Sequence, residues 1–141
     1  MKAREYLSQA YRLDQRIASD IEEVARLRMM SASISSPSWE EKTGGTRPTD
    51  PPFVRCLIKI LDLEAKINEE IDKLVDLKEE IRGVIEAVSD KDEQTVLRYR
   101  YIHNYTWEQI GEVMRADKRT AIRWHDKALS HVVVPENPIK I

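Results

Sequence analysis

The chain has 141 residues, of which 34% are charged and 41% hydrophobic, and its formal net charge at pH 7 is -2. No apolar run approaches the roughly 20 residues of a membrane-spanning helix, and the N-terminus alternates charged with apolar residues. We therefore expect neither a membrane protein nor a secretory signal, and predict a cytoplasmic location. The single cysteine, Cys56, excludes an internal disulfide and is expected to be a small buried hydrophobic residue.

The first predicted element is a long amphipathic helix over residues 2–30. Its apolar side chains recur at three- and four-residue steps, which is the period of one helix face, and Tyr6 and Tyr11 flank the stripe. The stripe consists of Leu7, Ala10, Leu13, Ile17, Ile21, Val24 and Leu27.

Residues 31–52 interrupt the helical pattern. They hold four of the six prolines, one Gly-Gly pair and five serines, a composition typical of a loop or disordered linker. Trp39 is the one large apolar side chain in this segment. Local packing of Trp39 on the helices and exposure to solvent or a partner are both open interpretations.

A second helix is predicted over residues 53–88, because its apolar residues follow a heptad pattern. Glu70 interrupts the pattern, and we expect the neighbouring Ile71 to replace it. We expect the two long helices to pair as an antiparallel, coiled-coil-like hairpin. The second helix is the longer, so part of its stripe is expected to contact either a second copy, in a dimer, or the C-terminal domain, unless the whole stripe is internal core. The stripe consists of Ile60, Leu63, Ile67, Leu74, Leu77, Ile81, Val84 and Val88.

A third helix is predicted over residues 91–103. Asp90 and Glu93 have the spacing of a capping box, in which each side chain accepts a hydrogen bond from the other residue's backbone N–H. Arg98 and Arg100 are expected on the helix surface, with phosphate or RNA polymerase contact as the alternative. The expected core side chains are Val96, Leu97, Tyr99, Tyr101 and Ile102.

A short fourth helix is predicted to begin at about Trp107. Thr106 and Gln109 form a T-x-x-Q capping box. Gly111 occupies a position where a second helix could approach closely. The helix is expected to end near Arg115, and the turn requires a left-handed backbone conformation there.

A fifth helix follows, with Asp117 as its predicted N-cap. At about 100° per residue, its apolar arc and its basic arc lie on opposite sides. The expected core face consists of Ala121, Trp124, His125, Ala128, Leu129 and Val132. The residues expected to contact DNA are Arg115, Lys118, Arg119, Thr120, Arg123 and Lys127.

The basic residues are concentrated locally, although the whole chain is slightly acidic. Residues 115–127 hold five basic and two acidic side chains, whereas residues 53–88 hold six and nine. A short helix, a tight turn and a basic second helix form the pattern of a helix-turn-helix that enters the DNA major groove. A merely solvated basic face is the alternative. With so few basic residues, a single copy is expected to bind DNA weakly.

Residues 95–129 resemble region 4 of bacterial sigma factors, the domain that reads a promoter element. The matching residues are Val96, Leu97, Arg98, Arg100 and Tyr101, then Thr106 to Ile110, Asp117 to Thr120 and Lys127 to Leu129. Most of the chain is similar to small prophage-borne proteins of Gram-positive bacteria, described as sigma-region-4-like or ArpU-type phage regulators. The matching pieces are REYLSQAYRLDQRI, KILDLEAKINEEIDKLVDLKEEI and RWHDKAL. The resemblance implies double-stranded DNA as a partner, together with RNA polymerase.

Enzymatic signatures are absent from the sequence. His103, His125 and His131 have no cysteine or carboxylate at metal-ligand spacing, and there is no glycine-rich phosphate loop, H-E-x-x-H motif or serine elbow. We therefore predict that the protein is not an enzyme and has no cofactor and no metal.

The sequence thus predicts an all-α protein with three parts. These are a helical hairpin over residues 1–88, a three-helix helix-turn-helix domain over 89–133 and an irregular tail over 134–141. The predicted function is sequence-specific DNA binding in the transcription of phage or prophage genes. The alternatives are a protein-interaction module, such as an anti-sigma protein or polymerase co-regulator, and a small terminase-like DNA-packaging protein.

Overall fold

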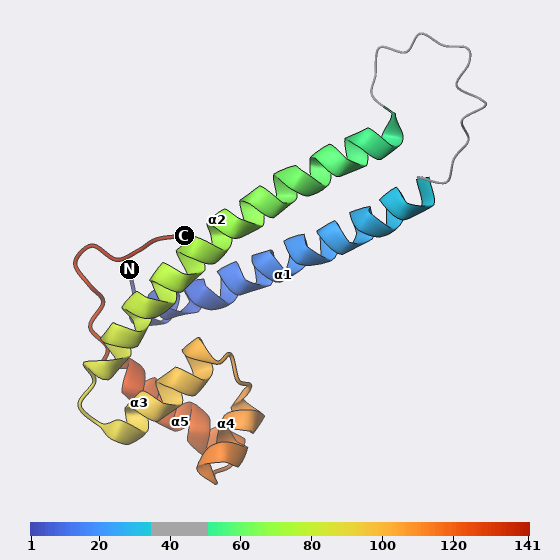
Figure 1. The fold of residues 1–141 in the computed structure, drawn as a ribbon. Coiled ribbons are helices and arrows are strands. Elements are labelled where there is room, and N and C mark those ends of the chain that lie inside the picture. The colour runs from blue at the N-terminus through green and yellow to red at the C-terminus, as the bar shows by residue number, and fades with distance from the viewer. Residues whose placement is uncertain (35–50) are drawn as a thin grey trace, which may run out of the picture. The chain divides into compact units, whose positions relative to one another are not determined.

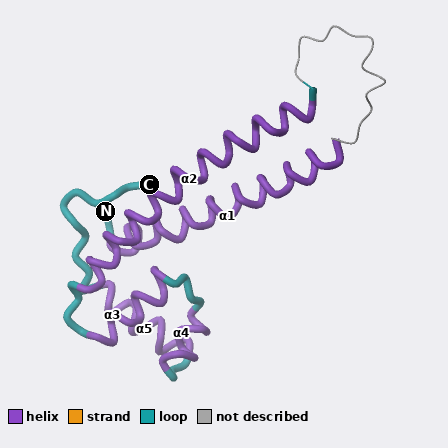
Figure 2. Tube along the Cα trace, viewed as in Figure 1, coloured by secondary structure: helices purple, strands orange, loops and turns teal. Residues whose placement is uncertain are grey.

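The structure is a computed structural model that describes residues 1–34 and 51–141. Figure 2 shows helix and loop and no strand in these ranges, so the prediction of an all-α fold is confirmed. The helices are α1 (Ala3–Ile34), α2 (Pro52–Glu86), α3 (Lys91–Leu97), α4 (Trp107–Met114) and α5 (Lys118–Leu129), and η2 (Arg98–Ile102) is a π-helical segment after α3 (Figure 1). Among the described helices, none combines the length and apolar character that a membrane span needs.

The chain divides into two compact units, and α1 and α2 each contribute to both. Unit 1 consists of residues 1–15 and 72–141, and unit 2 of residues 16–71. The domain boundary predicted from the sequence is different and lies between residues 88 and 89. The difference arises because the first turns of α1 and the last turns of α2 share a core with α3–α5, which periodicity along one helix does not show.

Unit 1 is organised around a continuous apolar core to which α1, α2, α3, η2 and α5 all contribute. Its most deeply buried members are Tyr6, Leu7, Ala10, Leu77, Ile81, Ile85, Leu97 and Ala128. The Tyr6 hydroxyl donates to Glu80 Oε2 over 2.7 Å, so the first turns of α1 are tied to α2 by a polar contact as well. Within the unit, α5 packs against both α3 and α4.

The C-terminal tail, residues 134–141, has no regular secondary structure but is held by hydrogen bonds. The side chain of Gln9, which is buried in α1, donates to the carbonyl of Ile139 over 2.8 Å and accepts from the N–H of Ile141 over 2.9 Å. Glu80 also accepts from the N–H of Ile139. The tail therefore covers part of the unit 1 core without a periodic pattern that the sequence could reveal.

Unit 2 is an antiparallel pair formed by the second half of α1 and the first half of α2. Ion pairs join Arg16 to Glu70 over 3.9 Å and Asp20 to Lys66 over 3.6 Å, and residue numbers that rise along one helix fall along the other. The buried seam between the helices consists of Ile17, Val24, Ile60, Leu63 and Ile67.

Two expectations about this seam are wrong. Glu70 is buried in it, whereas Ile71 is 39% exposed, and Ile21 of the α1 stripe is 51% exposed. The reason is geometric, because Glu70 continues the three- and four-residue steps from Ile67 and the next residue is rotated by about 100° out of the seam. Cys56 is half-buried rather than buried.

The helix ends also differ from the prediction. Helix α1 continues to Ile34, so Ser31–Ile34 belong to the helix and not to a linker. No glycine or proline interrupts this stretch, and the Ser33 hydroxyl donates to the carbonyl of Met30 over 3.0 Å. Trp39 and the rest of the predicted linker, from 35 to 50, lie outside the described residues.

Candidate nucleic-acid interface

The helix predicted over 91–103 is divided into two segments. Regular α-helix ends at Leu97, and the N–H of His103 bonds the carbonyl of Arg98, which is the spacing of a π-helix. Asp90 caps α3 by accepting from the N–H groups of Asp92 and Glu93, over 2.8 and 3.2 Å. The predicted capping box is incomplete, because the Glu93 carboxylate pairs with His131.

Helix α4 begins and ends as its local sequence predicts. Thr106 and Gln109 form the complete capping box, with bonds of 2.8 and 3.2 Å. Arg115 lies in the left-handed region at φ 56° and ψ 49°. A Cβ on Gly111 would lie 2.5 Å from the backbone oxygen of Ala116, so Gly111 permits the close approach of the turn itself.

Helix α5 is held in place at its first turn and along its inner face. Asp117 accepts from the N–H of Thr120 over 2.8 Å, and hydrogen bonds from the Thr120 side chain and then from this N–H lower the pKa of the Asp117 carboxyl. Ala121, His125 and Ala128 are buried, whereas Trp124, expected on the same face, is only half-buried. The opposite side of α5 is therefore left to charged residues.

Arg119 and Arg123 lie exposed on α5, and neither has an ion-pair partner among the described residues. Arg115 is also exposed and unpaired there. Lys118 differs, because its ammonium is 3.1 Å from the Glu108 carboxylate of α4. Thr120 is half-buried, and its backbone N–H is already used by the cap.

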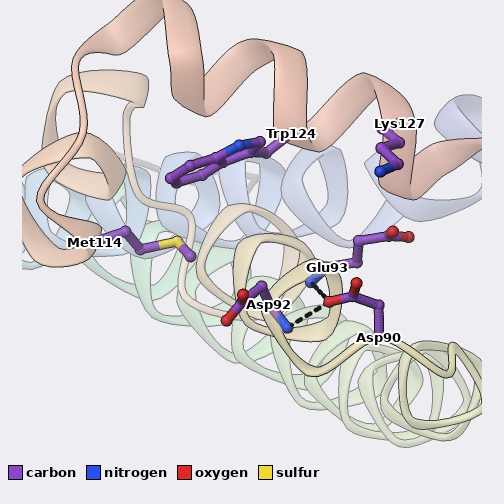
Figure 3. Close-up of a pocket in the computed structure, with 6 residues that line it drawn as sticks. All are labelled: Asp90, Asp92, Glu93, Met114, Trp124 and Lys127. Atoms are coloured by element: carbon purple, nitrogen blue, oxygen red, sulfur yellow. Dashed lines mark hydrogen bonds between the residues drawn. The ribbon is translucent and has the colours of Figure 1, made fainter.

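Lys127 lies apart from the two arginines. It lines a cavity of about 360 Å³ together with residues of α3, α4 and α5 (Figure 3). Figure 3 shows Lys127 and Trp124 extending from α5 toward the N-terminal end of α3. The other lining residues are Asp90, Asp92, Glu93 and Met114, so the surroundings of Lys127 are largely acidic.

A buried hydrogen-bonded group lies behind the outer face of α5. Tyr101 Oη is 2.6 Å from His125 Nε2, and His125 Nδ1 is 3.1 Å from Asp126 Oδ1. Burial lowers the pKa of His125, with a smaller opposing effect from Asp126. His125 is therefore a neutral core residue, with Nδ1–H donating to Asp126 and Nε2 accepting from the tyrosine.

Helix α1 contacts the outer face of α5 at Asp126, the residue that accepts from His125. Arg4 forms an ion pair with Asp126 over 3.2 Å. Sequence analysis did not identify this contact, because the two residues are 122 positions apart and nothing in either local segment indicates the other. Within the described residues no cluster of histidine, cysteine or carboxylate side chains could hold a metal ion.

A family model described as "Protein of unknown function (DUF1492)" matches residues 33–132. This range includes α2, α3, α4 and α5 entirely. No curated protein matches the chain, and no solved structure matches it.

Proposed function

We propose that this chain, which belongs to the family described as "Protein of unknown function (DUF1492)", is a sequence-specific DNA-binding regulator of transcription. In this proposal α5 enters the major groove and α4 lies across the DNA backbone. The resemblance of residues 95–129 to region 4 of sigma factors supports promoter DNA as the target and phage or prophage genes as the context.

The observation that carries the proposal is the pair of unpaired arginines on α5. Arg119 and Arg123 are exposed and four residues apart, and neither forms an ion pair with a carboxylate among the described residues, although both lie within the electrostatic influence of Asp117. A guanidinium in this position is able to bridge O6 and N7 of guanine or to bind a phosphate. The C-cap at Arg115 and the N-cap at Asp117 set the two ends of the turn between α4 and α5, so the arginines are presented from a defined helix.

The experiment is selection of bound sequences from random duplex DNA with the full-length protein. Wild type is expected to enrich a motif, and the double variant Arg119→Ala, Arg123→Ala is expected to lose it. Lys127→Ala is the matched control, because the lysine is on the same helix but beside the acidic residues of α3. Absence of any enriched motif at moderate salt, with and without RNA polymerase, would contradict the proposal.

The few basic residues of the α4–α5 pair imply that one copy binds DNA weakly, so we include a homodimer in the proposal. Unit 2 supports a second copy, because apolar side chains remain exposed on both of its helices. Ile21 is 51%, Met29 73% and Leu61 65% exposed. A second helix pair lying on this side would form a four-helix arrangement.

Light scattering tests the dimer separately from DNA binding. Wild type at tens of micromolar is expected to have twice the mass of one chain, and Leu61→Glu is expected to shift it to the monomer. Ser19→Glu is the control for the added charge, because Ser19 is exposed on α1 and rotated by about 200° from Ile21. A monomeric wild type would contradict the dimer and leave the DNA proposal to its own test.

The second candidate function is a protein-interaction module, such as an anti-sigma protein or polymerase co-regulator. The cavity beneath Trp124 favours it, because a half-buried indole, Met114 and the carboxylates of Asp90 and Asp92 together suit a basic protein segment. Binding of polymerase that Trp124→Ala abolishes, without any DNA motif, would support this candidate over the first.

A further inference from the structure

A second cavity in unit 1 lies where the N-terminal part of α1 meets η2 and the start of α4. Its volume is about 310 Å³, and its polar lining residues include Ser8, Tyr11, Arg12, Arg100, Asn104 and Thr106. These residues come from segments about 90 positions apart. The α1 residues of this cavity, Ser8, Tyr11 and Arg12, are not part of the helix-turn-helix pattern. The proposed contact of α5 with the major groove does not use them either.

The cavity is lined by two arginines, Arg12 and Arg100, that form no ion pair within the described part of the chain. Arg12 is exposed and has no ion-pair partner among the described residues. Arg100 donates to the carbonyl of Tyr105 over 3.0 Å and lies 4.1 Å from the centre of the Trp107 ring, but no described carboxylate pairs with it. The nearby carboxylate of Asp14 accepts from the Asn104 amide over 3.0 Å and forms no ion pair with either arginine.

Hydroxyl donors complete the lining. The hydroxyls of Ser8 and Tyr11 have no hydrogen-bond partner among the described residues. Thr106 Oγ1 accepts from the N–H of Gln109, and its own hydrogen is shared with the Glu108 carboxylate, so Thr106 borders the cavity without adding a free donor. Two guanidinium groups together with the hydroxyls of Ser8 and Tyr11 form a set of hydrogen-bond donors that suits a tetrahedral oxyanion, because such an anion accepts hydrogen bonds through each of its oxygens.

The cavity lies close to α5, because one aromatic side chain connects the two. Arg100 stacks on Trp107, and the Trp107 ring meets His125 of α5 edge-on with centroids 4.7 Å apart. The cavity is therefore separated from α5 by one aromatic side chain, at the start of the helix that precedes it. When a recognition helix lies in the major groove, the preceding helix crosses the phosphate backbone beside that groove.

We propose that this cavity binds a backbone phosphate of the DNA that α5 reads, with Arg12 and Tyr11 of α1 completing the site that Arg100 begins. The inference rests on the proposed DNA-binding function and adds a contact from outside the helix-turn-helix. Such a contact positions the protein on the duplex without reading sequence.

The test is duplex binding by full-length Arg12→Gln, measured by fluorescence anisotropy over a range of salt concentrations. Loss of one phosphate contact is expected to weaken binding equally on all sequences and to reduce the slope of log K against log salt by about 1. Arg12→Lys is expected to keep the wild-type slope. Arg55→Gln is the matched control, because Arg55 is equally exposed, has no described ion pair and lies on α2 outside the cavity.

The motif selected by Arg12→Gln is expected to equal that of wild type, in contrast to the double variant of Arg119 and Arg123. An unchanged salt slope in Arg12→Gln, with wild type binding DNA, would overturn this inference and leave the proposed function intact. A wild type that binds no duplex would overturn both. Titration with inorganic phosphate, followed by the amide resonances of Thr106 and Trp107, distinguishes the two sources of phosphate: binding of free phosphate together with an unchanged salt slope in Arg12→Gln would assign the cavity to free phosphate and overturn the DNA assignment.

Discussion

The backbone oxygen of Ala116 lies 2.5 Å from the position that a Cβ on Gly111 would occupy. The Ala116 N–H also bonds the carbonyl of Gly111 over 2.8 Å. The turn between α4 and α5 thus folds back on α4 so closely that only glycine fits. The orientation of α5, and of its arginines, depends on this contact.

Gly111→Ala is expected to destabilise the protein, because the added methyl group must displace backbone rather than a flexible side chain. Overpacking of this kind costs about 1–3 kcal/mol. Gly83→Ala is the control, since its added Cβ would meet nothing within 4 Å in the last turn of α2, and it is expected to stabilise by about 0.5–1 kcal/mol. Urea unfolding measures both. Equal effects of the two substitutions would contradict the tight turn.

Arg115→Gly is expected to raise stability and to lower DNA affinity. Arg115 has φ 56°, a conformation in which glycine avoids the steric cost of a Cβ, and relief of that cost contributes about 0.5–1 kcal/mol. The same change removes an exposed positive charge from the proposed interface. Thermal unfolding and duplex binding together measure the two effects, and a lower melting temperature would contradict the prediction.

Stability is expected to fall as the pH drops below 6.5, the usual pKa of histidine. Burial lowers the pKa of His125 in the folded protein, so below pH 6.5 the unfolded chain binds a proton that the folded chain does not. The stabilising contribution is complete above pH 6.5 and is lost as the pH falls toward the lowered value. Unfolding free energies at pH 8 and pH 5.5 check this. A variant His125→Gln is expected to lose most of the difference.

Tyr101→Phe is expected to cost about 1–3 kcal/mol at pH 8, because it leaves the buried His125 Nε2 without a hydrogen-bond partner. The bond removed is 2.6 Å long. Tyr99→Phe serves as the control, since Tyr99 is half-buried and its hydroxyl has no described partner. Similar losses in both variants would show that the tyrosine–histidine bond does not stabilise the fold.

Glu70→Gln is expected to stabilise the protein at neutral pH by about 1 kcal/mol. Burial in the helix seam raises the pKa of Glu70, and the facing Asp20 raises it further, against the attraction of Lys66 and Arg16. Asp20 Oδ2 and Glu70 Oε1 are both buried without a hydrogen-bond donor. The neutral amide keeps the shape of glutamate and removes the repulsion between the two carboxylates.

The pH dependence distinguishes this cause from simple repacking. A raised folded-state pKa means that the folded protein binds the proton more tightly, so protonated Glu70 stabilises below pH 4.5 and this contribution is lost as the pH rises. The advantage of Glu70→Gln is therefore expected at neutral pH and is expected to shrink toward pH 4.5. Glu69→Gln, at an exposed neighbouring position, is the control. An advantage independent of pH would contradict the explanation.

Local rules were sufficient where a residue's partner lies within one helical turn. The capping box at Thr106, the N-cap at Asp117 and the left-handed Arg115 each involve neighbours three to five positions away, and all three are present in the structure. Local rules were insufficient at Asp90, where the predicted partner Glu93 binds His131 instead, 38 positions away.

Hydrophobic periodicity predicted the helices, but it did not predict for every residue which side of the helix its side chain occupies. Glu70 was excluded from the seam because a buried carboxylate is costly, yet helix geometry keeps it there opposite Asp20. Lys127 was grouped with Arg119 and Arg123 by its four-residue spacing. Each such step rotates the side chain by about 40° around the helix, and two steps bring Lys127 to the acidic cavity beside Trp124.

The sequence by itself determined the all-α class, the positions of α4 and α5 and the conformation of the turn between them, because these depend on period, capping and the steric limits of nearby residues. Only the tertiary structure decided that the first turns of α1 share a core with α3–α5, that Arg4 pairs with Asp126, and that Arg12 meets Arg100 at one cavity. The physical reason is that each of these relationships joins segments distant in the chain, and packing of the whole core, rather than any local preference, brings them together.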